Sequence, residues 1–201
     1  MRMLVITDTH GVFKPIYEKH KDKLTDIQMI LLLGDHSQTD VLQIKDYFAK
    51  ETLLIYGIYG NHDIATTLAG TPCFDHKVCH FGFSFTGLNG SHRYKDSQIY
   101  GYTQKEGLWR AETLPKVDVL FSHDGPYNAS LDDAHCGLKG ITRYIKKKHP
   151  KTVIHGHLHK PNHYVIKHFG KQTDVYCVYQ LAIIDFNADG TVKELNQLET
   201  I

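Results

Sequence analysis

The sequence has few cysteines and no recognisable pattern among them. It contains no C-x-x-C pair, and its four cysteines are Cys73, Cys79, Cys136 and Cys177. This scarcity argues against a disulfide-rich scaffold and against a zinc module built on cysteine ligands. We expect free thiols in a reducing compartment, and we therefore predict a cytoplasmic location.

Long hydrophobic runs are also missing. Nowhere do about 18 apolar residues follow one another, which is the length that a membrane-spanning helix needs. Near the N-terminus, the apolar run Leu4-Val5-Ile6 is too short for the core of a signal peptide. The sequence therefore predicts that the protein has no membrane partner.

An excess of charge of either sign is absent as well. The chain has 23 Lys+Arg against 22 Asp+Glu, so its formal net charge is +1. That balance is far from the strongly basic one of a dedicated duplex-DNA binder. It is compatible with a small anionic substrate, because a bound metal ion carries its own positive charge. The length of 201 residues suits one domain, which we expect to span residues 1–201.

What is present is an alternation of apolar strands with helical patterns. In the first half we expect helices at 15–24 and 39–49, and strands at 4–6, 29–33 and 53–59. In the second half we expect a hairpin within 78–88, helices at 104–113 and 138–145, and strands at 117–121, 152–154, 163–167, 174–185 and 190–194. This alternation is typical of an α/β domain with a parallel sheet core. Short turns make the last three strands antiparallel, so we predict two sheets covered by helices.

Polar segments follow five of the predicted strands directly. They are Asp8–His10, Gly34-Asp35, Gly60–Asp63, Ser122-His123 and Gly156–His159. Because the carboxyl ends of the strands in an α/β sheet open into one crevice, we expect these five segments to meet in space.

The residue types in these segments suit a pair of metal ions. Two ions about 3.5–4 Å apart can hold the attacking and leaving oxygens of a phosphoryl displacement. Such a pair needs a carboxylate between the ions and neutral nitrogen or oxygen ligands around them. The chain has 15 histidines, and Asp8 and His10 are spaced to close on one ion. Each residue taken alone would more often be a turn former or a helix cap; the ordered set favours a metal site.

The ordered motifs D-x-H, G-D, G-N-H-D, H and G-H-x-H resemble those of the calcineurin-like metallophosphoesterase family, especially its compact bacterial or phage-type phosphoesterases. In this sequence they read Asp8-Thr9-His10, Gly34-Asp35, Gly60-Asn61-His62-Asp63, His123 and Gly156-His157-Leu158-His159. So long an ordered set is specific. The resemblance implies a four-layer αββα sandwich, in which helices flank two mixed β-sheets.

The resemblance also implies which residues hold metal. One ion would bind Asp8, His10, Asp35 and His159. The other would bind Asp35, Asn61, His123 and His157, so that Asp35 bridges the two ions. The cofactors would be two divalent transition-metal ions, with manganese first and iron, zinc, nickel or cobalt as alternatives.

His62 and Asp63 are the catalytic residues that the resemblance implies. His62 would face the phosphate rather than a metal, stabilising charge or protonating the leaving oxygen, and Asp63 would orient it. The implied reaction is the attack of a metal-bridging hydroxide on phosphorus, without a covalent enzyme intermediate.

Arg93 and His92 are the candidates for substrate binding, because a guanidinium group can hold a phosphate through two hydrogen bonds. The alternative for Arg93 is a solvated surface arginine. His36 and His155 flank predicted ligands and could support them, and His135 could touch the substrate. We expect a small phosphoester, a diester somewhat more than a monoester, with nucleotides among the candidates. The oligomeric state is left open.

Two other functions stay open at this point. One is a nuclease of the same family, although the net charge of +1 makes duplex nucleic acid an improbable partner. The other is a catalytically silent protein-binding scaffold with this fold, which the intact ligand set disfavours. A protein phosphatase is disfavoured too, because that branch usually has G-N-H-E where this chain has Gly60–Asp63.

Overall fold

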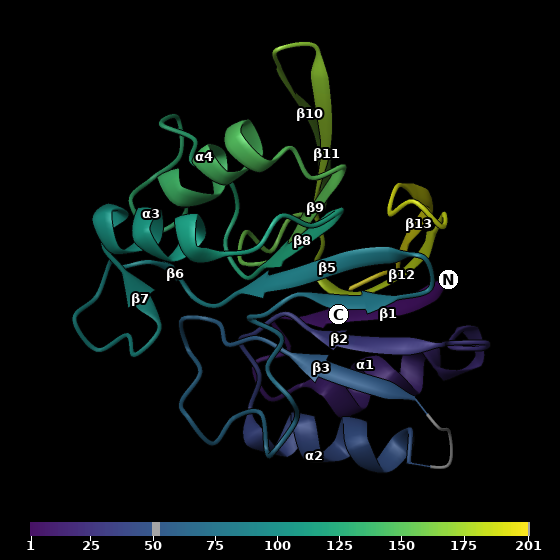
Figure 1. Ribbon diagram of the computed structural model, residues 1–201. Helices are drawn as coiled ribbons and strands as arrows, with labels where there is room; N and C mark the ends of the chain where they lie inside the picture. The colour runs from purple at the N-terminus through teal and green to yellow at the C-terminus, as the bar shows by residue number, and fades with distance from the viewer. Residues whose placement is uncertain (50–52, 201) are drawn as a thin grey trace.

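Two large mixed β-sheets form the centre of the computed structural model, which describes residues 1–49 and 53–200 (Figure 1). Sheet A has the order β13-β12-β1-β2-β3 and contains β1 (Arg2–Thr7), β2 (Met29–Leu32), β3 (Leu54–Gly57), β12 (Gln180–Phe186) and β13 (Val192–Gln197). Sheet B has the order β10-β11-β9-β8-β5-β4 and contains β4 (Val78–His80), β5 (Phe83–Leu88), β8 (Val119–Ser122), β9 (Thr152–His155), β10 (Asn162–His168) and β11 (Lys171–Cys177). A small third sheet pairs β6 (Ser91–His92) with β7 (Gly101–Tyr102).

Helices cover the outer face of each sheet. Sheet A is covered by α1 (Phe13–His20), which continues into the 3-10 turn η1 (Lys21–Lys23), and by α2 (Gln38–Tyr47). Sheet B is covered by α3 (Gln104–Thr113) and α4 (Lys139–Lys148). The order of layers is helices, sheet A, sheet B, helices (Figure 1). The expected αββα sandwich is confirmed.

Alternation along the strands builds three apolar layers. In β1, Met3 and Val5 face the core between the sheets, whereas Leu4 and Ile6 face α1 and α2. In β8, Phe121 belongs to the core between the sheets and the neighbouring Leu120 packs under α3 and α4. Strands buried on both faces read as continuous apolar runs, which is why the sequence shows them so clearly.

Both sheets are mixed: strands β1, β2 and β3 run parallel in sheet A, and β5, β8, β9 and β11 run parallel in sheet B. Among the described residues of these two sheets, the parallel pairs are β1–β2 and β2–β3 in sheet A, and β5–β8, β8–β9 and β9–β11 in sheet B. Strands β12 and β10 pair antiparallel with their neighbours β13 and β11, as the short turns predicted. The parallel strands therefore end together, and their following loops share one end of the sandwich.

The predicted single strand at 174–185 is wrong. Strand β11 ends at Cys177 in sheet B, and β12 begins at Gln180 in sheet A. The chain changes sheets between them, and Gln180 has a φ of 56° at the turn. Both segments are apolar, so the pattern of hydrophobic residues does not mark the break. Strands β6 and β7 were not predicted either, because each has two residues.

Other boundaries differ by a few residues. The helix expected at 15–24 ends at His20 as an α-helix, and η1 continues it. Helix α4 ends as expected before Pro150, with His149 in a left-handed conformation as its cap. The domain span of 1–201 stays a prediction, and residues 50–52 and 201 of it lie outside the described residues. Within the described residues, no helix is long and apolar enough to cross a membrane.

Candidate metal centre

The seven predicted ligands come from loops that follow the strands of both sheets. Sheet A supplies Asp8 and His10 after β1, Asp35 after β2 and Asn61 after β3. Sheet B supplies His123 after β8, and His157 and His159 after β9. The two sheets are joined at this point by hydrogen bonds, since the backbone N–H of His157 donates to Asp8 Oδ2 (3.0 Å). The expected meeting of the five loops is found in the structure.

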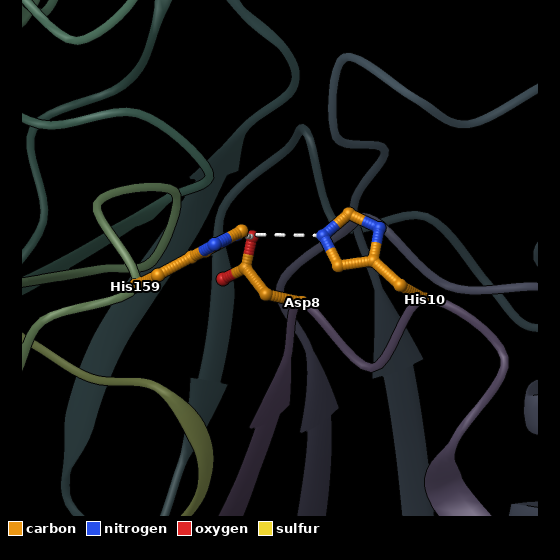
Figure 2. A group of neighbouring side chains, drawn as sticks. All are labelled: Asp8, His10 and His159. Carbon is orange, nitrogen blue, oxygen red and sulfur yellow. Dashed lines mark hydrogen bonds and ion pairs between the residues drawn. The ribbon is translucent and has the colours of Figure 1, made fainter.

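Asp8, His10 and His159 form the first cluster of possible ligands, with ligand atoms within 4.8 Å of one another. Figure 2 shows the rings of His10 and His159 approaching the Asp8 carboxylate from opposite sides. His159 Nε2 lies 3.3 Å from Asp8 Oδ1 and 3.4 Å from His10 Nε2. Asp8 is buried, and among the described residues its Oδ1 finds no donor for a hydrogen bond of normal geometry. Two ring nitrogens and a buried carboxylate oxygen pointing at one another are a donor set that fits a divalent cation.

Asp35, His123 and His157 form the second cluster, and all three are buried. His123 Nδ1 donates to the carbonyl oxygen of Leu33 (2.7 Å), which turns Nε2 toward Asp35 Oδ2 at 3.4 Å. His157 Nε2 donates to the carbonyl oxygen of Ala134 (2.8 Å), which leaves Nδ1 to bind a metal. A backbone carbonyl that fixes one ring nitrogen is the usual support of a histidine ligand. Asn61 Oδ1 lies 3.0 Å from His123 Nε2, beside the same cluster.

The charges of the second cluster are coupled. Burial alone would lower the pKa of His123, but the adjacent Asp35 carboxylate outweighs it and raises this pKa to about 10. Burial would raise the pKa of Asp35, but His123 outweighs it and holds this pKa well below its usual range. Without metal, His123 therefore carries a proton that opposes the Asp35 charge. A metal ion bound there must displace this proton.

The backbone at the ligand residues is unusual. Positive φ angles occur at Asp8 (52°), His10 (46°), Asp35 (56°), His157 (67°) and His159 (51°). Non-glycine residues adopt this conformation rarely and at a cost. Its concentration on five predicted ligands indicates that the loops are shaped for their side chains to converge.

Two glycines allow the ligand loops to approach each other. A Cβ at Gly156 would lie 2.6 Å from Asp8 Oδ2, and one at Gly60 would lie 2.5 Å from the backbone nitrogen of Asp35. Neither position has room for a side chain. The glycines before Asn61 and His157 are therefore required by close packing between loops.

His62 and Asp63 lie beside the clusters with different surroundings. The His62 ring is 5.4 Å from the His10 ring, and its backbone N–H donates to Asp35 Oδ1 (2.8 Å). The Asp63 carboxylate is buried and accepts from the backbone N–H groups of Asp35 (3.0 Å), His36 (2.9 Å) and Gly60 (2.6 Å). These contacts hold two loops together, and the orientation of the His62 ring by Asp63 stays a prediction.

His92 is the last residue of β6, and Arg93 directly follows it. Arg93 Nε donates to the carbonyl oxygen of Gly101 (2.9 Å), and its Nη2 lies 3.7 Å from Glu106. His92 Nε2 lies 3.3 Å from Asp133 Oδ1, and with Cys136 these two residues form a third group of ligand-type atoms. Both predicted substrate-binding side chains therefore have partners within the protein, and their roles stay predictions.

Sequence reasoning missed Tyr94 and Asp40. The Tyr94 hydroxyl lies 3.3 Å from Asn61 Nδ2 and 3.4 Å from His62 Nε2, and the only hint was its place next to Arg93. Asp40 is buried and accepts from the Thr9 hydroxyl (2.8 Å) and the Gly11 N–H (2.7 Å). Nothing in the spacing of Asp40 pointed to this role.

The supporting histidines are buried. His36 Nδ1 lies 2.7 Å from the Thr9 hydroxyl, and burial lowers the pKa of this imidazole to about 4. Burial likewise lowers the pKa of His155 to about 4. Both imidazoles are therefore neutral, and neither belongs to the two main clusters. The Asp132–Ala134 segment approaches the centre through the Ala134 carbonyl that accepts from His157.

These observations define a class of protein. It is the class of two-sheet α/β proteins whose strand ends carry clusters of metal-ligand side chains between the sheets. A profile of the calcineurin-like phosphoesterase superfamily domain matches residues 1–178, and the chain belongs to this superfamily. The resemblance drawn from the sequence motifs is confirmed. No curated protein sequence matches the chain significantly.

Several solved structures share the fold. Phosphopantetheinyl hydrolase (PptH) from Mycobacterium tuberculosis is 14% identical with a TM-score of 0.54, over 89% of each chain. NAD nucleotidase (NadN) from Haemophilus influenzae is 10% identical with a TM-score of 0.55, over 97% of this chain and 55% of that one. Vps29 in complex with Zn²⁺ from Entamoeba histolytica is 14% identical with a TM-score of 0.51, over 98% of each chain. At these identities, the similarity shows the fold alone.

Proposed function

We propose that the protein hydrolyses small phosphoesters at a centre of two divalent metal ions, with diesters favoured over monoesters. The observation that carries this proposal is the meeting of two ligand clusters, Asp8–His10–His159 and Asp35–His123–His157. Superfamily membership supports a phosphoesterase. Manganese is the first candidate for the metal, and the free cysteines agree with the reducing, cytoplasmic setting that we propose.

When bound, two such ions supply Lewis acidity and make a water molecule acidic enough to act as a nucleophile at neutral pH. The protein would hold them through Asp8, His10 and His159 on one side, and through His123, His157 and Asn61 on the other. Asp35 is the proposed bridge, because its carboxylate is buried beside His123 and accepts from the His62 N–H. Two aspartates leave a centre of net positive charge, which suits a phosphate oxygen.

His62 is the proposed proton donor to the leaving oxygen. The His62 side chain is exposed to solvent beside His10, and its Nε2 lies 3.4 Å from the Tyr94 hydroxyl. Tyr94 can therefore orient the imidazole from the substrate side. We infer that Asp63 is a positioning residue, because its carboxylate accepts from the N–H groups of Asp35 and Gly60 and so holds these two loops together.

The experiment is a hydrolysis panel on protein reconstituted with Mn²⁺, Zn²⁺, Co²⁺, Ni²⁺ or Fe²⁺. The substrates are a chromogenic phosphodiester, the matching monoester, a cyclic nucleotide and a short DNA duplex. We expect the highest kcat/KM on the diester and complete loss of turnover with a chelator. Efficient, salt-sensitive cleavage of the duplex would favour a nuclease instead. Metal uptake without turnover of any substrate would favour a scaffold.

A further inference from the structure

A third cluster of ligand-type side chains lies outside the seven predicted ligands of the metal centre. It consists of His92, the last residue of β6, and of Asp133 and Cys136 in the segment between β8 and α4. One nitrogen, one oxygen and one sulfur atom of these side chains lie within 4.8 Å of one another. Imidazole nitrogen, carboxylate oxygen and thiolate sulfur are the three kinds of ligand that zinc takes in proteins.

The backbone around His92 fixes the direction of its ring. The N–H of His92 donates to the buried carboxylate of Asp124 (2.9 Å), and β6 pairs with β7. The ring Nδ1 lies 3.3 Å from the carbonyl oxygen of Tyr102 and donates to it, because a carbonyl can only accept. A carbonyl that accepts from one ring nitrogen is the usual support of a histidine ligand. The other nitrogen, Nε2, is thereby turned toward Asp133.

His92 Nε2 and Asp133 Oδ1 face each other at 3.3 Å. In the neutral ring with its proton on Nδ1, Nε2 is an acceptor, and an ionised carboxylate has acceptors alone. Such a pair is favourable when a cation lies between the two atoms, either a second ring proton or a metal ion. Two ligand atoms of one tetrahedral zinc ion, each about 2.0–2.2 Å from the metal, are roughly 3.3–3.6 Å apart. The observed distance therefore fits a shared zinc ion.

The sulfur of Cys136 favours the metal over the proton. A proton on His92 would need Asp133 alone, whereas a metal ion also uses the thiolate as a third ligand. The Cys136 side chain is buried, and Gln104 Nε2 donates to its Sγ (3.9 Å). An N–H group directed at the sulfur stabilises the thiolate form. The Asp133 side chain is 79% exposed, which leaves one side of the cluster open to an entering ion and to water.

A turn brings Asp133 and Cys136 to the same place and also reaches the metal centre. The Asp132 carboxylate accepts from the N–H of Ala134 (2.9 Å) and so closes the turn. The carbonyl oxygen of Ala134 accepts from His157 Nε2 (2.8 Å). An ion in the third cluster would thus hold the turn that supports a ligand of the second cluster.

We propose that His92, Asp133 and Cys136 bind one Zn²⁺ ion, with a water molecule as the fourth ligand. The ion links β6 to the turn after β8, and its role is structural, separate from the two ions of the proposed function. On binding, a zinc–sulfur bond forms and the thiol proton of Cys136 leaves to solvent, without any change of oxidation state. His92 receives a role other than the substrate contact predicted from the sequence. A single cysteine with ligands from another element has no sequence signature, so the spacing of the cysteines did not reveal it.

Cobalt(II) is the probe for this site. A cobalt–thiolate bond gives a charge-transfer band in the near ultraviolet, and the seven predicted ligands of the metal centre include no cysteine. Titration of the metal-free, full-length protein with Co²⁺, in a non-thiol reductant, should produce this band. Zn²⁺ should then remove it, because zinc displaces cobalt from such ligands. No thiolate band at saturating Co²⁺ would overturn the proposal and leave a proton as the cation between His92 and Asp133.

Variants assign the band to the third cluster. Cys136→Ala should lose it, and Cys79→Ala is the matched control that should keep it, because Cys79 is exposed and belongs to no cluster. Because Cys136 is buried and its variant could misfold, Asp133→Ala is the second variant, on an exposed side chain. It should keep the band and raise the Co²⁺ concentration for half-saturation at least about tenfold. A band that survives in Cys136→Ala, or wild-type affinity in Asp133→Ala, would contradict the assignment.

Turnover of the chromogenic diester on the same samples separates this inference from the proposed function. Metal-dependent turnover without a thiolate band contradicts the third-cluster proposal alone. A thiolate band that depends on Cys136, but with no turnover of any phosphoester, supports the zinc site and contradicts the hydrolase.

Discussion

At the scale of single residues, Asp35 has the most demanding position in the centre. Its carboxylate is buried, accepts from the His62 N–H at 2.8 Å through Oδ1 and faces His123 through Oδ2. Its own N–H donates to Asp63, and its φ is 56°. Backbone, charge and hydrogen bonds all converge on this one side chain, so its replacement should affect the centre more widely than that of any other ligand.

Asp35→Asn should lose both metal ions, whereas His10→Ala should keep the ion at the second cluster. The reason is that Asp35 is the proposed bridge, and His10 belongs to the first cluster alone. Elemental analysis of the purified variants measures the metal content. His76→Ala is the matched control, because His76 is an exposed histidine that belongs to neither cluster. Two full equivalents of metal in Asp35→Asn would exclude the bridging role.

His62→Ala should keep its metal while kcat falls by about 10²–10⁴-fold on a diester with a poor leaving group, the usual contribution of a general acid. A good leaving group needs less protonation, so the loss should be smaller there. Tyr94→Phe, which removes the hydroxyl 3.4 Å from His62 Nε2, should show a weaker form of the same pattern. A parallel fall of metal content and activity in His62→Ala would make His62 a ligand.

At the scale of elements, α2 holds the first ligand loop in place through Asp40. This residue completes a capping box with Ser37 at the start of α2. The same carboxylate accepts from the Thr9 hydroxyl and from the N–H groups of Gly11 and Phe13, across to the loop that carries Asp8 and His10. One side chain thus links the helix start to the ligand loop.

Asp40→Asn should destabilise the protein by about 1–3 kcal/mol, because buried N–H groups lose a charged acceptor. Burial would raise the pKa of Asp40, but the hydrogen bonds from Thr9 and the backbone outweigh it and lower this pKa from 3.8. A lowered folded-state pKa contributes stability above the unfolded value, and that contribution is lost as pH falls through the folded value. Denaturant unfolding should therefore show that wild type has a larger free energy of unfolding than Asp40→Asn at neutral pH. This difference in free energy should narrow below pH 3.8.

Asp46→Asn is the matched control for this experiment, because Asp46 is an exposed aspartate on the same helix. It should change the free energy of unfolding by less than about 0.5 kcal/mol. If the difference in free energy of unfolding between wild type and Asp40→Asn stays constant with pH, the role given to the Asp40 charge is contradicted.

At the scale of the whole molecule, the packing of the sandwich does not depend on the metal centre, whereas the centre depends on the sandwich. The core between the sheets and the two helix-covered cores use none of the seven predicted ligands. The ligand loops, in contrast, join the two sheets through contacts such as His157 to Asp8. The sheets should therefore keep their structure without metal, while metal adds a further link between them.

Chelation should lower the melting temperature without changing the far-UV circular dichroism spectrum at room temperature. At a free metal concentration a hundredfold above Kd, binding adds about 2.7 kcal/mol of stability. For a protein of this size, that corresponds to roughly 5–10 °C in Tm. Melting curves over a series of metal concentrations measure it, with Mg²⁺ compared against Mn²⁺ as the control for ionic effects. A Tm independent of the chelator would contradict a resident metal centre.

The sequence by itself determined the layers of the fold and the edge at which the candidate site lies. Runs such as Met29–Leu33 are apolar at every position, which is the pattern of a strand buried on both faces. Residues that directly follow parallel strands must share one end of a sheet, so the proximity of Asp8, Asp35 and His123 could be predicted from strand order. Both inferences rest on local sequence patterns, which can be read from one amino-acid sequence without its structure.

The tertiary structure alone decided which atoms face each other. The change of sheet at Gln180, the loop-holding role of Asp63, and the link from Asp40 to the Asp8 loop depend on contacts between residues distant in sequence. A cavity lined by His135, Leu158 and Tyr164 likewise arises where the segment after β8 lies against β10. Periodicity reports the face on which a side chain lies, but its partner across a layer is set by the packing of the whole chain, and no local pattern contains that information.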